Sequence, residues 1–265
     1  MTAGHFELDQ EFAAFDGITG IDEAGRGCLA GPVVIAAVTW NPEKAATCSW
    51  FPNLADSKQL DAKAREFLYP RVLGYASRIK VAVIGPALID YLNILRATLH
   101  GFELVAPPPN ANFPLLIDGN QKPPTLKYAK TIVKGDSRVS AISAAGIIAK
   151  VSRDRLMTHL ARTQPQYHFE IHKGYATKKH REAIKVHGPG NMHRKSFRPV
   201  SDFDQESLPA DDELIFDPKA PWALWNRIID NYHRYSRTGC RKALEQLTRA
   251  GLGILPSARD PICTL

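Results

Sequence analysis

Short apolar runs alternate with longer amphipathic stretches along the first two hundred residues of the chain. Five of the runs are bounded by Gly, Pro, Asn or Asp and are typical of strands: 18–22, 33–40, 79–85, 113–118 and 129–136. The stretches between them carry apolar residues at three- and four-residue spacing, which indicates helices. This alternation predicts an α/β fold, in which helices cover a sheet.

Four helices are expected from the same pattern. The first spans 61–74, and the second begins at Pro86 and ends before the prolines at 107–109. The third and fourth span 139–163 and 178–186. Asp56 or Ser57 is expected to cap the first helix. The second is expected to bury one apolar stripe: Leu88, Leu92, Leu95, Leu99 and Phe102.

The third helix is rich in small residues, so we expect another element to pack closely against it. Its central charged residues are expected to form pairs four residues apart or to be solvated: Lys150, Arg153, Asp154 and Arg155.

Acidic residues stand at or just past the ends of three of the predicted strands: Asp22, Glu23, Asp118 and Asp136. The pair Asp22-Glu23, taken alone, fits a solvated strand exit better than a functional site, because acids are common at protein surfaces. If the strand ends converge, however, the carboxylates would repel one another unless a cation neutralised them. Oxygen-only ligands favour Mg²⁺ or Mn²⁺ over Zn²⁺. Two such ions roughly 3.5–4 Å apart could hold the attacking and leaving oxygens of a phosphodiester.

Two basic positions are candidates for binding an anion: one follows the acidic pair, and the other precedes the first expected helix. The turn Gly25-Arg26-Gly27 lets the backbone approach a ligand closely and offers charge to an anion. Lys58 is a candidate phosphate ligand, and a solvated lysine beside a helix cap is the alternative.

Composition favours a polyanionic partner. The chain has 34 Lys and Arg against 27 Asp and Glu, and many of its acids gather between residues 202 and 217, so the rest is more basic than the total suggests. The four cysteines show no C-x-x-C spacing, which argues against a zinc site. Without an apparent export signal or membrane-spanning run, we expect a cytoplasmic, monomeric protein that does not contact a membrane.

The chain is expected to divide at its acidic, proline-containing segment. We expect a catalytic domain over 1–200, an acidic linker over 201–221 and a helical C-terminal extension over 222–265. An aromatic stripe between Trp222 and Tyr235 would either dock on the main body or contact nucleic acid or another partner.

Several motifs, in the same order, resemble those of the ribonuclease HII family, the bacterial type 2 ribonucleases H. The matching motifs lie between about residues 17 and 199: Gly20-Ile21-Asp22-Glu23-Ala24-Gly25-Arg26-Gly27, Asp56-Ser57-Lys58, Leu92-Asn93-Ile94-Leu95, Ile117-Asp118-Gly119-Asn120, Lys134-Gly135-Asp136-Ser137 and His172-Lys173-Gly174-Tyr175. Two departures are Cys28, where the family often has proline, and Gly146, where serine is common.

The resemblance implies an RNase H-like fold, with a mixed sheet flanked by helices. It also implies endonucleolytic cleavage of the RNA strand of RNA–DNA hybrids, and of duplex DNA that contains ribonucleotides, in DNA replication and repair. By resemblance, Asp22, Glu23, Asp118 and Asp136 bind the metal ions.

By the same resemblance, Gly25, Arg26, Gly27 and Tyr175 sense the ribose 2′-hydroxyl and the RNA-to-DNA junction. A partly buried structural tyrosine is the alternative for Tyr175. A metal-dependent phosphatase and a non-catalytic nucleic-acid-binding protein are the alternative functions.

Overall fold

The computed structural model describes residues 6–12, 14–54, 60–109 and 113–203, which divide into two compact units. The sheet unit contains the described residues up to Arg26, Val33–Ile84 and Leu95–Leu156, and the α7 unit contains Gly27–Pro32, Gly85–Ile94 and the described chain from Met157. Three expected features lie outside the described residues: Lys58, nearly all of the acidic linker, and the whole C-terminal extension with its aromatic stripe. The expected division into domains therefore stays a prediction.

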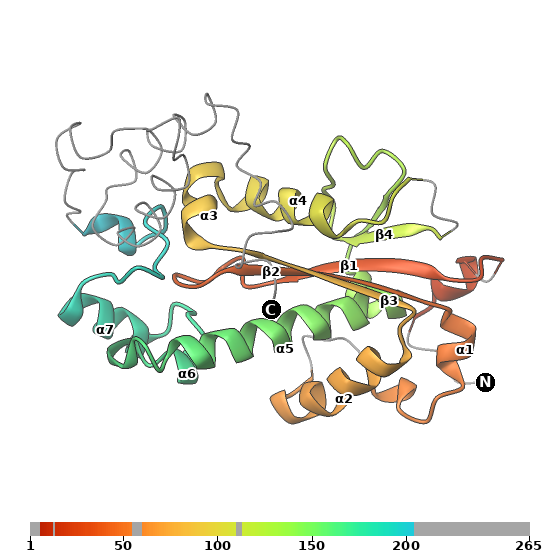
Figure 1. Cartoon of the computed structure of the whole chain (residues 1–265), viewed down its shortest axis with the longest axis horizontal. Helices are drawn as coiled ribbons and strands as arrows, with labels where there is room; N and C mark the ends of the chain where they lie inside the picture. Colours follow the sequence, from red (N-terminus) through yellow and green to blue (C-terminus); the bar gives the residue numbers. More distant parts are fainter. Residues whose placement is uncertain (1–5, 13, 55–59, 110–112, 204–265) are drawn as a thin grey trace, which may run out of the picture. The chain divides into compact units, whose positions relative to one another are not determined.

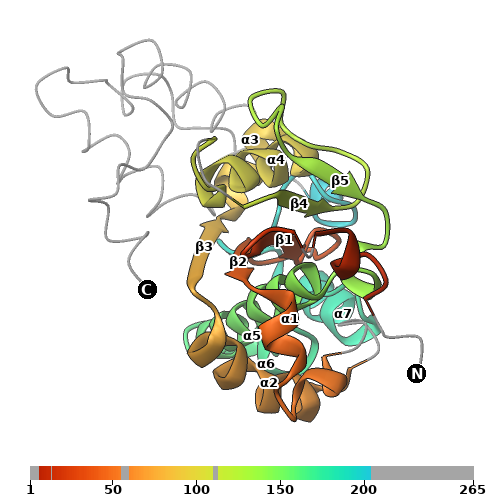
Figure 2. The same ribbon diagram turned by 90° about the vertical axis from the view of Figure 1, so that its right-hand side faces the viewer.

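The sheet unit is built on one five-stranded mixed sheet (Figure 1), whose strands lie in the order β3-β2-β1-β4-β5 (Figure 2). Its strands are β1 Ile18–Ala24, β2 Val33–Trp40, β3 Arg78–Ile84, β4 Leu115–Asp118 and β5 Lys130–Ile132. Neighbours β1–β2 and β2–β3 are antiparallel, whereas β1–β4 and β4–β5 are parallel. All five expected strands are present, which confirms the α/β prediction.

Helices cover both faces of this sheet, as the end-on view in Figure 2 shows. The helices of the sheet unit are α1 Pro42–Ala46, α2 Ala62–Tyr75, most of α4 Ile94–Val105 and most of α5 Ser140–Leu160, with 3-10 turns at Asp9–Phe12, Phe51–Asn53 and Gly135–Ser137. Helix α4 lies on one face, and α2 and α5 lie on the other. No helix in the described ranges is both long and apolar enough to cross a lipid bilayer.

Two expectations about these helices were wrong. Asp61, not Asp56 or Ser57, caps α2 by accepting a hydrogen bond from the Ala64 amide at 2.7 Å. The single helix expected from Pro86 is broken at Asn93, whose φ is 71°, into α3 Pro86–Leu92 and α4.

The break also shifts the buried face of the expected apolar stripe. Phe102 is buried, but the four leucines of the stripe are only half-buried. The buried positions of α4 are instead Ala97, Thr98, Gly101, Phe102 and Val105.

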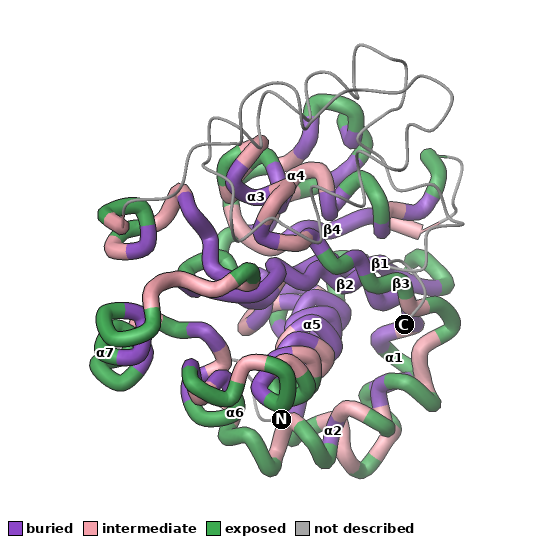
Figure 3. The backbone as a smooth tube through the Cα atoms, turned by 60° about the vertical axis from the view of Figure 1, so that its left-hand side comes forward, coloured by how far each residue is buried: buried purple, intermediate pink, exposed green. Residues whose placement is uncertain are grey.

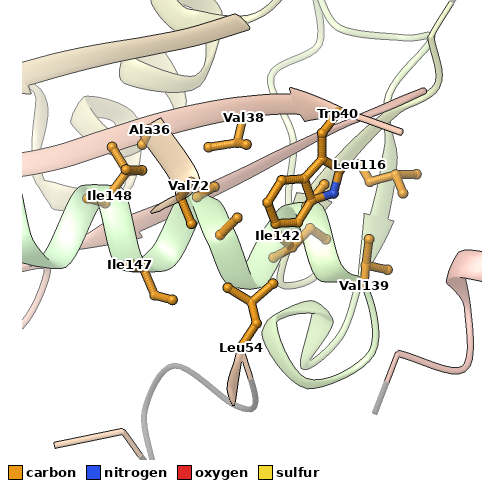
Figure 4. Packing of buried hydrophobic residues seen from close by; sticks show 14 of the residues in the cluster. Ala36, Val38, Trp40, Leu54, Val72, Leu116, Val139, Ile142, Ile147 and Ile148 are labelled. Atoms are coloured by element: carbon orange, nitrogen blue, oxygen red, sulfur yellow. The ribbon is translucent and has the colours of Figure 1, made fainter. Parts of the chain in front are cut away.

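The main core lies between the sheet and α5. Apolar side chains from β2, including Val38 and Trp40, pack on α5 residues such as Ile142 and Ile148 (Figure 4), and the tube in Figure 3 is buried along much of this interface. The Trp40 indole Nε1 donates to Ser140 Oγ at 3.1 Å, so its one polar atom is satisfied within the core.

Helix α5 approaches β1 closely at Gly20. An added Cβ at Gly20 would lie 2.2 Å from the Ala141 carbonyl carbon. This contact confirms the expectation that another element packs closely on the small-residue helix.

The α7 unit contains α3, the 3-10 turns Pro165–Tyr167 and Val200–Asp202, the short helix α6 Phe169–His172 and α7 Lys178–His187. Asp90 of α3 accepts hydrogen bonds from the backbone amides of Lys195 and Ser196, at 2.7 and 2.8 Å. The carboxylate thereby holds the segment that follows Arg194 in place.

Three buried histidines form the centre of the α7 unit: His172, His180 and His193. The rings of His172 and His180 stack with centroids 4.2 Å apart, and the Nε2 atoms of His180 and His193 are 3.0 Å apart. Burial lowers the pKa of His180 to about 4 and that of His193 to about 3, and it also lowers the pKa of His172. These rings therefore stay neutral at neutral pH.

The substitution Gly20→Ala is expected to lower the free energy of unfolding by about 3 kcal/mol, because a buried methyl group would overlap the α5 backbone. Urea denaturation followed by circular dichroism measures the change. Gly74→Ala is the matched control: Gly74 lies in α2 with no atom within 4 Å of an added Cβ, so alanine should leave stability unchanged or raise it by up to about 1 kcal/mol. Equal effects of the two substitutions would contradict the close packing of β1 on α5.

The substitution His180→Asn is expected to remove an acid-dependent loss of stability. His180 has a folded-state pKa of about 4 against an ordinary value of 6.5, so below pH 6.5 the unfolded chain gains a proton that the folded chain does not. Stability from the neutral ring is therefore fully present above pH 6.5 and is lost as the pH falls toward 4. The unfolding free energy of the wild type, relative to the variant, should fall by about 1.4 kcal/mol per pH unit over this window.

Urea titrations of both proteins at about pH 7.5 and about pH 5.5 test this difference. The comparison with the variant is needed because Asp9 acts in the opposite direction: burial raises its pKa to about 6. A difference that does not change with pH would show that folding does not lower the pKa of His180.

Candidate active site

The parallel strands of the sheet unit place three acids at one edge of the sheet. Ile21 of β1 pairs with Ile117 of β4, so Asp22 and Asp118, the next residues, leave neighbouring strands side by side. Asp118 in turn pairs with Ile132 at the end of β5, and Asp136 follows in the 3-10 turn Gly135–Ser137. The carboxyl ends of parallel strands are where α/β sheets form their sites.

Neighbouring residues Asp22 and Glu23 point to opposite faces of the sheet, as expected from a strand. Asp22 pairs with Ala36, which belongs to the core on the α5 side. Glu23 pairs with Ile35, whose side chain meets Gly101 of α4 on the opposite face. The strand therefore delivers one carboxylate to each side of its end.

Several of the carboxylates are held by the chain itself. Asp22 Oδ1 accepts a hydrogen bond from the Glu23 amide at 2.7 Å, and Asp118 Oδ1 accepts one from the Gly135 amide at 2.7 Å. Glu23 Oε1 lies 3.3 Å from the Arg26 guanidinium. Asp22, Glu23 and Asp118 are thus each held by a neighbouring group of the chain.

The four acids are close enough to affect one another electrostatically. Burial, followed by the charges of Glu23, Asp118 and Asp136, raises the pKa of Asp22 well above its ordinary value. Asp22 and Asp136 are both buried. The structure thus brings Asp118 and Asp136 close enough to the Asp22-Glu23 pair to act on it, although they lie about a hundred residues further along the chain.

The donor set fits a hard divalent cation. It consists only of carboxylate oxygens, and a cation among them would offset the mutual repulsion that raises the pKa of Asp22. Within the described ranges, however, no three His, Cys, Asp or Glu side chains already converge as a metal-binding group. The carboxylates, held by their separate hydrogen bonds, would have to reorient to share an ion.

The turn after β1 packs on a buried arginine of α5. Gly25 has a φ of +96°, and an added Cβ there would lie 2.0 Å from Arg153 Nε. Arg153 is fully buried, whereas Arg26 is exposed. Only glycine fits at position 25, because any side chain would displace the guanidinium beneath it.

The expectation that Arg153 is solvated or paired four residues along the helix was wrong, and sequence reasoning missed its place beneath the turn. The signal was available: Arg153 follows Ala145 and Ala149 at four-residue spacing and so shares their buried helix face. The other charged residues of α5 met the expectation in part, since Lys150 and Asp154 form the predicted i,i+4 pair at 2.8 Å.

Gly27 and Tyr175 both belong to the α7 unit. Two residues after the exposed Gly27, Leu29 donates its amide to the carbonyl of Gly174 at 2.9 Å, and Gly174 directly precedes Tyr175. The Tyr175 side chain is 40% exposed. Part of its surface is therefore open to a ligand, and the alternative of a partly buried structural tyrosine is equally consistent with this exposure.

His180 and His193, whose rings support this loop, were not identified from the sequence. A histidine within a basic helix resembles the exposed residues around it, and only the apolar positions Ala183 and Ile184 mark the buried face of α7. Lys58 lies outside the described residues, so its expected contact with phosphate stays a prediction.

Comparisons with known proteins give a consistent result. The family model of ribonuclease HII matches residues 19–200. The ribonuclease HII of Francisella philomiragia is 47% identical over 184 residues, which make up 69% of this chain and 97% of that protein.

Solved structures agree on the fold. The crystal structure of ribonuclease H2 from Pyrococcus horikoshii matches with a TM-score of 0.54 and 26% identity, covering 70% of this chain and 96% of that one. Bst-RNase HIII, crystallised in complex with Mn²⁺, matches with a TM-score of 0.53 over 76% of this chain and 70% of its own, and at 19% identity it supports the fold alone. These findings confirm the expected RNase H-like sheet flanked by helices, and by the extent and identity of the sequence match the chain belongs to the ribonuclease HII family.

Proposed function

We propose that this protein is an endoribonuclease that hydrolyses the RNA strand of RNA–DNA hybrids and also cuts at ribonucleotides embedded in duplex DNA. Membership of the ribonuclease HII family makes it a ribonuclease H. The observation that carries the proposal is that Glu23, Asp118 and Asp136 all act electrostatically on Asp22 at the carboxyl ends of neighbouring strands. A basic chain supplies the matching attraction to a nucleic-acid backbone.

The four acids would hold two Mg²⁺ or Mn²⁺ ions. When bound, such ions stabilise negative charge on the attacking and leaving oxygens of a phosphodiester during in-line displacement. Asp22 is the central ligand in this proposal, because the other three acids all act on it electrostatically. The Gly135 amide keeps Asp118 oriented toward the turn that carries Asp136. The products would carry 3′-hydroxyl and 5′-phosphate ends.

The resemblance to the family supports a role for Gly25, Arg26 and Gly27 in recognising the ribonucleotide. In the sheet unit, Arg153 supports Gly25 from beneath, so the backbone of the turn is held for close approach to a 2′-hydroxyl. Tyr175, with its exposed ring, would stack on the deoxyribose that follows the ribonucleotide.

We also propose that the protein acts as a monomer in the cytoplasm. Cys28 and Cys48, the cysteines within the described ranges, are free thiols, as a reducing compartment would maintain them.

The substitution Asp22→Asn is expected to reduce cleavage of a duplex with one embedded ribonucleotide by about a hundredfold or more, because metal stabilisation of the transition state is worth several kcal/mol. Initial rates with Mg²⁺ and with Mn²⁺ measure the loss. Without divalent ions, the unfolding midpoint of the variant should be unchanged or higher, since asparagine removes a buried acid from beside three others.

Asp16→Asn is the matched control for this prediction. Asp16 is an exposed acid of the sheet unit that pairs with Lys44 at 3.4 Å, and its amide variant should cleave like the wild type. Undiminished cleavage by the Asp22 variant would exclude the proposed metal site.

The substitution Tyr175→Ala is expected to slow cleavage at a single embedded ribonucleotide by about tenfold, with a much smaller effect on long RNA–DNA hybrids. The reason is that lost stacking costs about 1–3 kcal/mol per contact and matters most where only one ribonucleotide marks the position. The ratio of kcat/KM for the two substrates is the measurement.

Tyr128→Ala removes an aromatic ring of nearly equal exposure, 41% against 40%, and should leave that ratio unchanged. Equal losses on both substrates in the Tyr175 variant would mean that this ring serves general binding and not junction recognition.

A further inference from the structure

A hydrogen-bonded chain of histidines ends at the backbone of Tyr175. His180 Nδ1 lies 2.8 Å from the Tyr175 carbonyl oxygen, and its Nε2 lies 3.0 Å from His193 Nε2. His193 Nδ1 accepts a hydrogen bond from the Gly190 amide at 2.9 Å. The chain thus runs from the loop after α7, through two buried rings, to the tyrosine.

The partners of these rings fix their protonation. A carbonyl oxygen can only accept, so His180 must carry its proton on Nδ1. An amide N–H can only donate, so Nδ1 of His193 must be unprotonated and its proton must sit on Nε2. His193 then donates to His180 Nε2, and all contacts are satisfied with both rings neutral. A second proton on His180 would set two N–H groups against each other.

His172 supports the other side of the same loop. Its Nδ1 accepts the Gly174 amide at 3.2 Å, and its Nε2 donates to the Tyr167 carbonyl at 2.7 Å. The His172 carbonyl oxygen accepts the Tyr175 amide at 2.9 Å. The Tyr175 amide is therefore bonded to the backbone of His172, and its carbonyl is bonded to the His180 ring and to the Thr177 amide at 2.8 Å.

The loop itself adopts a conformation that needs such support. Lys173 and Gly174 have φ values of 51° and 82°, in the left-handed region. An added Cβ at Gly174 would lie 2.4 Å from the Ala30 carbonyl oxygen. The backbone is thus closely confined, while Tyr175 itself is 40% exposed.

We propose that His180, backed by His193 and His172, is a positioning residue that fixes the orientation of Tyr175 for recognition of a single ribonucleotide in duplex DNA. The inference rests on the proposed function, since it assigns a support to a side chain that the proposal uses. Because the three rings are buried and bonded to protein groups, the proposed role acts through Tyr175 and not on the substrate directly.

The surroundings of the three histidine rings keep them neutral. Burial is the largest influence and lowers the pKa of each of the three rings. Besides the three histidines, three charged or titratable groups act on His172: Glu170 raises its pKa, and His168 and Lys179 lower it. His180 and His193 are influenced otherwise by backbone groups and by the other rings of the chain. The positioning bonds therefore persist through the neutral pH range.

Two substitutions of His180 separate its two contacts. By bond count from Cβ, the amide nitrogen of asparagine replaces Nδ1, whereas the amide group of glutamine replaces Nε2. His180→Gln should therefore lose the bond to the Tyr175 carbonyl and keep a partner for His193, and His180→Asn should do the reverse.

The test is the kcat/KM ratio for a duplex with one ribonucleotide against a long RNA–DNA hybrid. His180→Gln is expected to lower this ratio about fivefold, as expected for the loss of one positioning hydrogen bond, and His180→Asn is expected to restore most of it. His187→Gln, an exposed histidine of the same helix, is the matched control and should leave the ratio unchanged.

A double substitution shows whether His180 acts through Tyr175. In the Tyr175→Ala background, His180→Gln should lower the ratio no further, because the side chain that it positions is gone. An equal drop in both backgrounds, or an unchanged ratio in His180→Gln alone, would overturn the inference.

A wild-type enzyme that cuts long hybrids but not the single-ribonucleotide duplex would instead overturn the proposed recognition of single ribonucleotides, and this inference with it.

The wild-type protein provides a measurement that does not depend on how the variants fold. Imidazole ¹⁵N chemical shifts at neutral pH should show neutral rings, with the proton on Nδ1 of His180 and on Nε2 of His172 and His193. A doubly protonated His180, or one protonated on Nε2 alone, would overturn the inference.

Discussion

The parallel pairing of β1 with β4, and of β4 with β5, is the constraint on which the sheet unit depends. It aligns the carboxyl ends of three strands, so acids separated by about a hundred residues in the chain meet at one edge. The antiparallel pairing of β1 with β2 fixes the faces, which sends Asp22 toward α5 and Glu23 toward α4. A shift of β1 by one residue would exchange these two side chains.

The carboxylates in this arrangement repel one another, and hydrogen bonds from nearby backbone amides partly offset the repulsion. Burial and three neighbouring carboxylates disfavour the ionised form of Asp22, while backbone amides stabilise Asp22 and Asp118 individually. The tight core between β1, β2 and α5 keeps the strand ends from separating under this repulsion. A divalent cation would remove the repulsion that the fold maintains, which supports the proposed metal site.

The α7 unit also stabilises buried polar groups by hydrogen bonds from nearby parts of the chain, but its groups are neutral. Stacked and hydrogen-bonded histidines pack with the buried rings of Tyr167 and Phe169 next to a loop whose backbone is left-handed at two successive residues. Each ring nitrogen has a partner of defined direction, so the network holds one arrangement of protons and one backbone conformation. An exposed aromatic ring on such a support loses little further conformational freedom when it binds a ligand.

The sequence by itself determined the five strands, the helical segments and the four acids, because periodicity and strand-end position are local properties that a linear pattern carries. It also carried the family motifs. The tertiary structure alone decided the break at Asn93, the cap at Asp61, the burial of Arg153 beneath Gly25 and the histidine chain behind Tyr175. These features depend on which segments pack together, and a charged or titratable residue in a helix reads as exposed until a distant part of the chain covers it.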